Sequence, residues 1–514
     1  MQGNTGMGEH GNTTAIIIGA GPAGLTAAYE LGKAGAAAIV LEQDAVVGGL
    51  AKTVNHKGFR FDIGGHRFYT KVKAVDEIWH EVLTEKDFKR RKRLSRIYYK
   101  KKFFHYPLRL SSVLFKLGIV DSCLILASYF YARLFPLRAE LTFEQWVTNR
   151  FGRRLYKIFF KSYTEKVWGI PCGEITADWA AQRIKGLSLG QVLKDTLIRQ
   201  THRGEQSVVK TLINEFEYPR LGPGMMWEKM ADLVRESGGT IRSGSRVEKI
   251  RWSKEKIEAV ELVNEGRNES LSGTHFVSSM PIRELVHKLA PPPPPHVLAA
   301  ADKLQYRDFL TVVLIINKRD LFPDNWIYIH DPEVKMGRVQ NFKNWSSDMV
   351  PDPNKTCLGL EYFCFEGDGL WTMSDADLVE LGKLELQKLG LAQPGDVAEG
   401  TVVRVPKAYP VYDSTYKQSL HTVRCFLEIF SNLQLVGRNG MHKYNNQDHS
   451  MLTAMLAAQN ILGANHNLWE VNTDADYQEE IKSPAPMVEI AASQPRVPRR
   501  IGECSPTPAI EFEA

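Results

Sequence analysis

Runs of apolar residues near the start of the chain alternate with a helical pattern. The stretch TAIII (14–18) is apolar, a glycine-rich turn and a helical segment follow, and a second apolar run leads to Glu42. Short continuous apolar runs bounded by turns are typical of strands buried on both faces. Residues 14–65 therefore predict strand, glycine turn, helix, strand, turn and strand.

Along the rest of the chain, the pattern changes several times between helical and strand-like. Residues 75–200 are mainly helical in pattern, and 239–282 return to strand-like runs. Strands and turns alternate over 308–365, and a helix follows at 374–389. A last strand, turn and helix end near residue 464. A chain that leaves a doubly wound domain and later returns to it would produce this order, so the pattern predicts an α/β fold.

One polar segment interrupts two apolar ones near the end of this pattern. GRNGMHKYNNQDHS (437–450) lies between LQLV and the apolar helical stretch MLTAMLAAQNIL. Buried polar groups need hydrogen-bond partners. The segment is therefore either a surface loop or a wall that faces a polar ligand.

The first turn carries the fingerprint of a dinucleotide-binding domain. Gly19 permits the tight turn, Gly21 lets backbone approach a pyrophosphate, and Gly24 allows the helix to pack closely on the strand. The helix N-terminus then offers free N–H groups and a favourable dipole to phosphates. Glu42 follows Gly24 by 18 residues, where a carboxylate binds ribose hydroxyls and disfavours a 2′-phosphate. A lone GxGxxG is a weak signal, but the complete unit is a strong one.

Two further glycine pairs indicate FAD rather than NAD. Gly48 and Gly49 would bring backbone close to a ligand again, which a simple NAD domain does not need. Their motif, GGLAKT, resembles the FAD-binding extension of the amine oxidase and protoporphyrinogen oxidase superfamily. Many of its members have arginine where this chain has Leu50, which argues against an amine oxidase.

The next motif, FRFDIGGHRF, places the pair Gly64 and Gly65 before His66. A lone histidine is most often a packed core residue, but two glycines in this fold favour a position beside a flavin ring. The predicted cofactor is FAD, and no spacing of cysteines or histidines indicates a metal site.

The predicted fold class is α/β, with a Rossmann-like FAD-binding domain, a helical insertion and a strand-rich substrate domain. The FAD-binding domain is expected in three pieces, 14–75, 239–285 and 426–464. We assign the other regions as follows: a flexible N-terminus at 1–13, a mainly helical substrate or insertion region at 76–238, a strand-rich substrate domain at 286–425, and a disordered tail at 483–514.

Composition limits the class of protein further. The chain has 514 residues, too many for one compact core, and its 43% hydrophobic and 24% charged residues are ordinary for a globular protein. A net charge of +6 does not by itself indicate nucleic acid. The six cysteines form no disulfide framework, and the N-terminus has no signal-peptide pattern, so we expect a cytoplasmic protein.

The stretch 113–137 is apolar and long enough to span a bilayer. It contains Lys116, Asp121 and Arg133, whereas spanning segments usually have few or no charges. We interpret it as a buried or interfacial helix. Weak contact with the inner face of a membrane stays open, because basic runs lie just upstream, although a solvated face explains those runs more simply.

Several motifs in order resemble the UDP-galactopyranose mutase family over roughly residues 14–464. They are GGLAKT, GFRFDIGGH, RLSRIYYKKKFFHYPLR, KSYTEKVWG, ADWAAQRI, WIYIHDPEVKMGRVQNFKNWS, AYPVYD and the polar segment 437–450. The resemblance implies a reduced-FAD enzyme that interconverts the pyranose and furanose forms of a nucleotide sugar. It implies attack by flavin N5, a flavin–sugar adduct and no net redox change.

The resemblance also implies roles for individual residues. Arg183 and Arg438 would lie beside the flavin and Trp168 at the uracil, while Arg338 would hold the diphosphate with its planar fork. The implied catalytic residues are His66, Arg183 and Arg338. The implied cofactor residues are Gly19, Gly21, Gly24, Glu42, Gly48, Gly49, Leu50, Gly64, Gly65, His66, Val247, Gly437, Arg438 and Asp448. The implied substrate residues are Tyr106, Arg109, Trp168, Tyr328, Arg338, Tyr409 and Tyr444.

Departures from the family pattern leave the substrate open. Arg109 stands two residues after Pro107, where eukaryotic relatives have a neutral polar residue, and YPRLGPGMMWEKMADL differs from the family's glycine-rich counterpart. Another nucleotide sugar or a lipid-linked sugar phosphate could be the substrate, and NAD(P)H or a reductase could supply electrons. The alternatives are an FAD-dependent oxidoreductase or desaturase acting on a lipid or amine, and a non-catalytic flavin-binding subunit.

Overall fold

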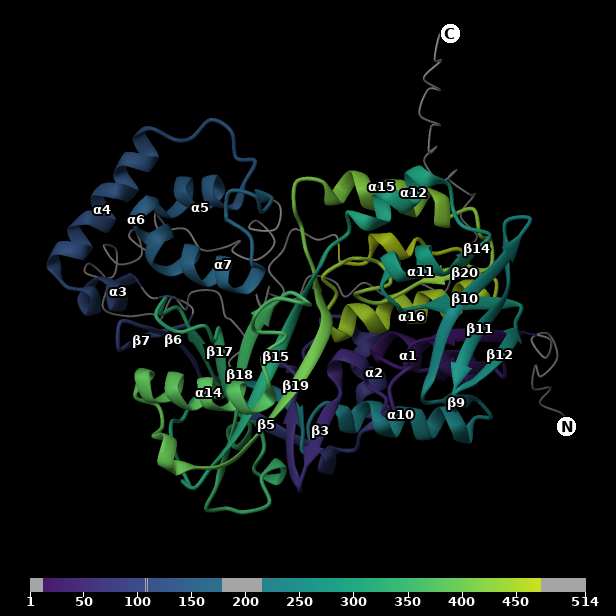
Figure 1. The fold of residues 1–514 in the computed structure, drawn as a ribbon, viewed down its shortest axis with the longest axis horizontal. Coiled ribbons are helices and arrows are strands. Elements are labelled where there is room, and N and C mark those ends of the chain that lie inside the picture. The colour runs from purple at the N-terminus through teal and green to yellow at the C-terminus, as the bar shows by residue number, and fades with distance from the viewer. Residues whose placement is uncertain (1–12, 107, 109, 178–214, 473–514) are drawn as a thin grey trace, which may run out of the picture.

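A computed structural model describes residues 13–106, 108, 110–177 and 215–472 (Figure 1). Its first sheet is parallel and has the strand order β20-β13-β1-β2-β9. The strands are β1 (Thr14–Ile18), β2 (Ala37–Leu41), β9 (Thr240–Arg242), β13 (His275–Ser278) and β20 (Leu433–Leu435). Segments far apart in sequence therefore build one sheet, and the predicted α/β class with a Rossmann-like FAD-binding domain is confirmed.

Each face of this sheet is covered, which explains why its central strands β1 and β2 are mainly apolar. Successive side chains of β1 alternate between two cores: Ala15 and Ile17 enter one, Ile16 and Ile18 the other. The first core contains α1 (Pro22–Lys33), α2 (Lys73–Val82), α10 (Gly224–Glu236) and α16 (Gln447–Ile461). The second contains α11 (Ile282–Lys288), α12 (Pro295–Asp302) and α15 (Tyr416–Leu427).

A four-stranded sheet also packs into the second core, in the order β12-β11-β10-β14. Its strands are β10 (Ser245–Ser253), β11 (Lys256–Asn264), β12 (Arg267–Ser272) and β14 (Leu289–Ala290). The start of β10 carries Val247 toward the cavity described below.

A mixed seven-stranded sheet forms the centre of the substrate region, in the order β19-β15-β18-β17-β16-β6-β7. Its strands are β6 (Ser95–Tyr99), β7 (Lys102–His105), β15 (Tyr306–Ile316), β16 (Trp326–Ile329), β17 (Arg338–Asn341), β18 (Thr356–Cys364) and β19 (Val397–Pro410). Helix α14 (Asp375–Leu389) packs on one face through Leu378 and Leu386. Two small antiparallel pairs border this sheet: β3 (Thr53–His56) with β4 (Phe59–Asp62), and β5 (Phe88–Lys92) with β8 (Glu215–Pro219).

A helical lobe lies at the opposite end of the molecule from β11 and β12 (Figure 1). It contains α3 (Leu110–Leu117), α4 (Ile119–Leu134), α5 (Phe143–Phe151), α6 (Arg153–Leu155), a π-helical turn (Tyr156–Lys161) and α7 (Ser162–Trp168). Its apolar core is continuous with Tyr106, Leu108 and Tyr328. In the part of the chain that the structure describes, no helix is both long and apolar enough to cross a membrane.

The region predicted as mainly helical, 76–238, is more mixed in the structure. Strands β5, β6 and β7 lie within it. The sequences of β6 and β7, SRIYY and KFFH, mix buried and half-buried positions as half-buried strands do. The neighbouring basic runs obscure this pattern in the sequence. Helix α10 also belongs to the core of the FAD-binding domain, where Met226, Trp227 and Met230 are fully buried. The termini 1–12 and 473–514 lie outside the described residues.

Candidate functional site

The turn between β1 and α1 has no room for side chains. Gly19 has a φ of +101°, and a Cβ on Gly24 would lie 1.8 Å from the Gly19 carbonyl oxygen. A Cβ on Gly49 would lie 3.1 Å from the Cα of Gly21, so the two glycine loops pack backbone against backbone. Gly21 and Pro22, the first residue of α1, line a cavity. This cradle can hold a phosphate group against the helix N-terminus.

Glu42 follows β2 beside this turn and lines the same cavity. Its buried carboxylate accepts hydrogen bonds from the backbone N–H groups of Ala20 at 2.7 Å and Asp44 at 2.9 Å. Burial raises the pKa of Glu42, and these two hydrogen bonds oppose the shift. Because a carboxylate has about four acceptor positions, about two stay available to ribose hydroxyls.

One cavity of about 1930 Å³ runs from the glycine turn to the substrate sheet and the helical lobe. Typical ligand pockets measure roughly 300–1,000 Å³, so this volume can hold a dinucleotide and a second ligand. The predicted site residues that line it are Gly19, Gly21, Glu42, Gly49, Leu50, Gly64, Gly65, His66, Tyr106, Trp168, Val247, Tyr328, Arg338, Tyr409, Gly437, Arg438, Tyr444 and Asp448. Gly24 and Gly48 lie behind this wall and shape the backbone turns.

His66 lies where the glycine cradle meets the substrate end. Burial, together with the positive charges of Arg438 and Arg338, lowers the pKa of His66 to about 3. Its side chain is partly exposed and lines the cavity. The lowered pKa means that the imidazole is neutral at physiological pH. A Cβ on Gly64 would lie 3.1 Å from His66 Nε2, and one on Gly65 would lie 3.5 Å from Arg338 Nη1. The two glycines thus let both side chains approach the backbone.

Arg338, on β17, forms a buried ion pair with Glu361, on the neighbouring strand β18. Arg338 Nε and Nη2 lie 2.8 and 2.5 Å from the same oxygen of Glu361, whose side chain is 0% exposed. Gln340 donates a hydrogen bond to the other oxygen at 2.5 Å. Burial opposes the charge on Arg338, but Glu361 raises its pKa above the usual value. The guanidinium is therefore fixed, with Nη1 on the side of Gly65 and the cavity.

Helix α7 is fixed against this sheet by two cations, the half-buried Lys166 and the buried Arg307. Lys166 donates hydrogen bonds through Nζ to the carbonyl oxygens of Ile329 (3.2 Å), Asp331 (2.9 Å) and Met336 (3.0 Å). Arg307, on β15, donates to the carbonyl oxygen of Val167 at 3.1 Å. Burial lowers the pKa of Lys166 to about 8. These contacts hold α7 so that Tyr163 lies against Tyr328 of β16 and Trp168 lies near Tyr409 of β19.

Aromatic rings from five separate segments form the substrate end of the cavity. Tyr409 stacks on Tyr444 with ring centroids 5.6 Å apart, and Trp168 lies 6.2 and 6.3 Å from these two rings. Tyr328 lies 4.9 Å from Tyr106 and 5.7 Å from Tyr163. Burial raises the pKa values of Tyr163 and Tyr409 above the usual value, so both hydroxyls stay protonated and can donate hydrogen bonds.

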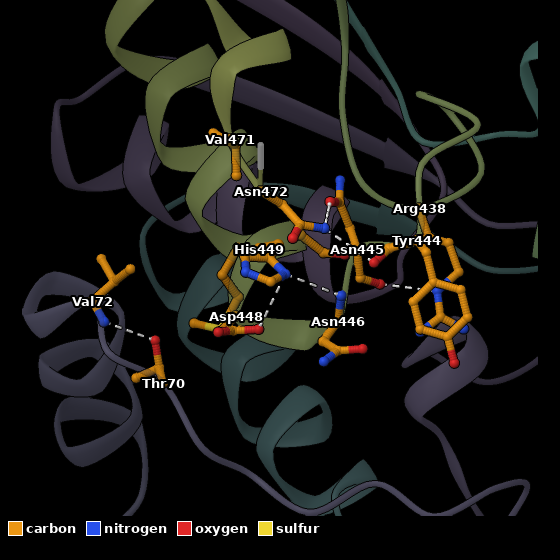
Figure 2. A network of polar contacts seen from close by, with 12 residues as sticks. Thr70, Val72, Arg438, Tyr444, Asn445, Asn446, Asp448, His449, Val471 and Asn472 are labelled. Atoms are coloured by element: carbon orange, nitrogen blue, oxygen red, sulfur yellow. Dashed lines mark hydrogen bonds and ion pairs between the residues drawn. The ribbon is translucent and has the colours of Figure 1, made fainter. Parts of the chain in front are cut away.

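Arg438 organises the polar segment 437–450 (Figure 2). Its guanidinium donates to the carbonyl oxygens of Asn445 at 2.9 Å and Ala408 at 3.0 Å, and its carbon lies 4.7 Å from the ring centroid of Tyr444. A Cβ on Gly437 would lie 3.1 Å from Ala23 Cβ in α1. The segment is therefore a wall of the cavity beside the glycine turn, and the surface-loop alternative is wrong.

Asp448 lies in the first turn of α16 at this wall. Its carboxylate is 3.7 Å from His449 Nδ1, which also accepts a hydrogen bond from the backbone N–H of Asn446 at 3.4 Å (Figure 2). Burial raises the pKa of Asp448. The negative charge lies at a helix N-terminus, where the helix dipole favours it.

Two predicted residues, Arg109 and Arg183, lie outside the described residues. Conversely, three residues near the site were not predicted: Tyr163, Gln340 and Glu361. Tyr163 belongs to the motif KSYTEKVWG and lines the cavity. The sequence offered a way to find Glu361, because it is the one charged residue in the otherwise uncharged stretch TCLGLEYFC. A charge in a fully buried strand needs a partner, which here is Arg338.

A family model for flavin-containing amine oxidoreductases matches residues 22–462. The chain belongs to this family. It is an FAD-dependent enzyme of the amine oxidase superfamily, and the glycine cradle with Glu42 fits that cofactor.

The names of similar proteins belong to different classes of enzyme. The reduced form of UDP-galactopyranose mutase superposes with a TM-score of 0.77 and 20% identity, over 90% of this chain and 98% of the mutase. A protein named as a protoporphyrinogen oxidase, from Exiguobacterium sp. 255-15, gives 0.66 and 14%, over 88% and 99%. At these identities the likeness shows the fold alone. An inactive all-trans-retinol 13,14-reductase of Danio rerio is 53% identical over 53 residues, which span only 10% of this chain and 9% of that relative.

Proposed function

We propose that this enzyme is a mutase that interconverts the pyranose and furanose forms of a nucleotide sugar with reduced FAD. The observation that carries the proposal is the position of Arg338. Its fixed guanidinium lies among tyrosine rings and near His66, in the cavity that also contains the glycine cradle. Such a cation with directed hydroxyl donors suits a sugar-linked diphosphate.

The cofactor would be held mainly by backbone. The α1 N-terminus with Gly19 and Gly21 would bind the pyrophosphate, and Glu42 would bind ribose hydroxyls. The remaining cofactor assignments are Gly24, Gly48, Gly49, Leu50, Gly64, Gly65, His66, Val247, Gly437, Arg438 and Asp448. When bound and reduced, FAD supplies a nucleophilic nitrogen.

The substrate diphosphate would bind at the aromatic end. Arg338 Nη1 would contact it, while Glu361 keeps the guanidinium in place without competing for that nitrogen. Tyr328, Tyr409, Tyr444 and the newly identified Tyr163 would donate hydroxyl hydrogen bonds, with Trp168 against the nucleobase and Tyr106 beside Tyr328. Arg109 and Arg183 stay predicted contributors.

His66 would act as a neutral hydrogen-bonding group rather than as an acid with a positive charge. Two arginines nearby and its burial disfavour the imidazolium form. At neutral pH it would orient the reacting sugar hydroxyls or the cofactor edge through one donor and one acceptor. Catalysis in this proposal depends on positioning and exclusion of water, because the cofactor carries the difficult chemistry.

The second candidate is an FAD-dependent oxidoreductase or desaturase that acts on a lipid or amine. It is favoured by the apolar side of the same cavity, which includes Leu108, Phe143, Phe159 and Phe160. The names of the oxidase and reductase relatives are consistent with this class.

One experiment separates the two candidates. The purified enzyme is reduced with dithionite, given UDP-galactose or UDP-galactofuranose, and the products are separated by chromatography. The proposal expects isomerisation only with reduced enzyme, and none with oxidised enzyme. Absence of turnover across a panel of nucleotide sugars, with oxygen consumption on a lipid or amine, would support the oxidoreductase instead. NAD(P)H in place of dithionite would test the source of electrons.

A further inference from the structure

The solvent-facing side of α4 is apolar, which reverses the usual arrangement of a surface helix. Its inner side packs into the helical lobe through Ile125, Tyr129 and Ala132. The exposed positions follow helical spacing and lie on the outer side. They are Ile119, Val120, Cys123, Leu124, Ala127, Phe130, Tyr131 and Leu134, together with Arg133 near the C-terminal end.

Neighbouring segments extend this apolar surface. Gly118 has a φ of +94° and breaks the apolar stretch into α3 and α4. Phe115, in α3, is 90% exposed, and Phe135, Leu137 and Leu141 are exposed after α4. Single exposed apolar residues are normal, but a contiguous group of large ones marks an interaction surface. We call the exposed apolar residues from Phe115 to Leu141 the α3–α4 surface.

The charge around this surface is strongly positive. Residues 100–161 contain twelve Lys and Arg but only three Asp and Glu. Two of the three acids are neutralised within the lobe, Asp121 by Arg154 at 2.5 Å and Glu140 by Arg150 at 2.8 Å. At one end Lys102 Nζ donates to the Lys116 carbonyl oxygen at 2.6 Å, which places the basic β6–β7 turn beside the end of α3.

We propose that the α3–α4 surface docks on an anionic lipid bilayer, with its apolar side chains at the boundary between headgroups and acyl chains. An apolar face flanked by lysine and arginine is the composition that binds such surfaces. The helices lie on the membrane in this arrangement, since neither could cross it. A second copy of the chain is a poorer occupant, because the two positive lobes would repel each other.

The test is co-sedimentation of the FAD-loaded full-length protein with sucrose-filled vesicles. One set contains phosphatidylcholine alone, and the other contains equal parts of phosphatidylcholine and phosphatidylglycerol. Wild type should sediment with the anionic vesicles, and less so at high salt. Leu124→Gln with Tyr131→Gln should weaken vesicle binding by roughly tenfold or more, because two large apolar groups no longer enter the bilayer.

Leu384→Gln is the matched control. Leu384 is 58% exposed on α14, outside the α3–α4 surface, so this variant should bind vesicles like wild type. Flavin absorbance and thermal midpoint should not change in either variant, since all three positions are exposed. Wild type that stays in the supernatant with both vesicle types would overturn the proposal, as would a double variant that binds normally. A dimer in sedimentation velocity that the double variant dissociates, without vesicle binding, would also overturn it.

Discussion

The two ends of the cavity are built in different ways. At the cofactor end, backbone of two glycine loops and one carboxylate form the wall, and little depends on side chains. At the substrate end, side chains from α7, β16, β17, β19 and the segment 437–450 meet, and two cations hold them together. The cofactor end therefore suits one constant ligand. The substrate end could bind a different ligand after substitution of its side chains.

The largest effect is expected at the cofactor end. Gly24→Ala would place a Cβ 1.8 Å from a backbone oxygen, which cannot move without opening the turn. We expect the free energy of unfolding to fall by more than ~3 kcal/mol. We also expect that no flavin-loaded protein can be purified. Gly395→Ala is the control, because a Cβ there would meet no atom within 4 Å. Flavin absorbance and thermal unfolding provide the measurement. Normal flavin content in Gly24→Ala would show that close backbone packing at this turn is not needed to bind the flavin.

At the substrate end, the Arg338–Glu361 pair should dominate stability. Arg338→Ala leaves a fully buried carboxylate without its cation and should cost about 3–5 kcal/mol in urea unfolding. The double variant Arg338→Met with Glu361→Gln removes both charges and should recover most of that loss. Binding of UDP, measured by calorimetry, should stay weak in both variants. If stability and UDP binding recover together, Arg338 is structural and does not bind the diphosphate.

A single hydroxyl at the same end should have a smaller effect. Tyr409→Phe keeps the ring stacked on Tyr444 but removes one hydrogen-bond donor. UDP should bind about fivefold more weakly, equivalent to about 1 kcal/mol, with unchanged flavin content. Tyr131→Phe, on the exposed side of α4 and outside the cavity lining, should bind UDP normally. Equal UDP affinity in all three proteins would remove Tyr409 from the proposed diphosphate site.

The smallest effect concerns His442, a buried residue of the segment 437–450. Burial lowers the pKa of His442 to about 4, so below pH 6.5 the unfolded chain takes up a proton that the native state does not. Stability from neutral His442 is therefore full above pH 6.5 and falls as the pH decreases toward 4. His442→Asn suits the left-handed backbone at this position, where φ is +46°.

This variant lacks the proton-linked loss. From pH 7.5 to pH 5.5, wild type should lose about 1 kcal/mol more of its free energy of unfolding than His442→Asn loses. Urea unfolding of both proteins at the two pH values measures this shift. If the free energies of unfolding of the two proteins change with pH in parallel, His442 is protonated in the native state.

The two ends also differ in how well the sequence predicted them. Glycine spacing and Glu42 predicted the cradle, because backbone turns depend on local sequence. Tyr328, Tyr409 and Tyr444 were predicted only through a family resemblance, since no local rule places residues that far apart along the chain in one wall. The pairing of Arg338 with Glu361 depends on the register of β17 against β18, which the apolar pattern does not determine.

The central claim is that a sugar-nucleotide diphosphate binds in the same cavity as the flavin. The most direct measurement is a titration of the FAD-loaded enzyme with UDP, followed by the flavin absorption spectrum. The claim predicts a saturable spectral change that is lost in Arg338→Met with Glu361→Gln, although that variant keeps its flavin. No change in the flavin spectrum with UDP or UDP-galactose, together with a clear change on adding a lipid or amine, would contradict it.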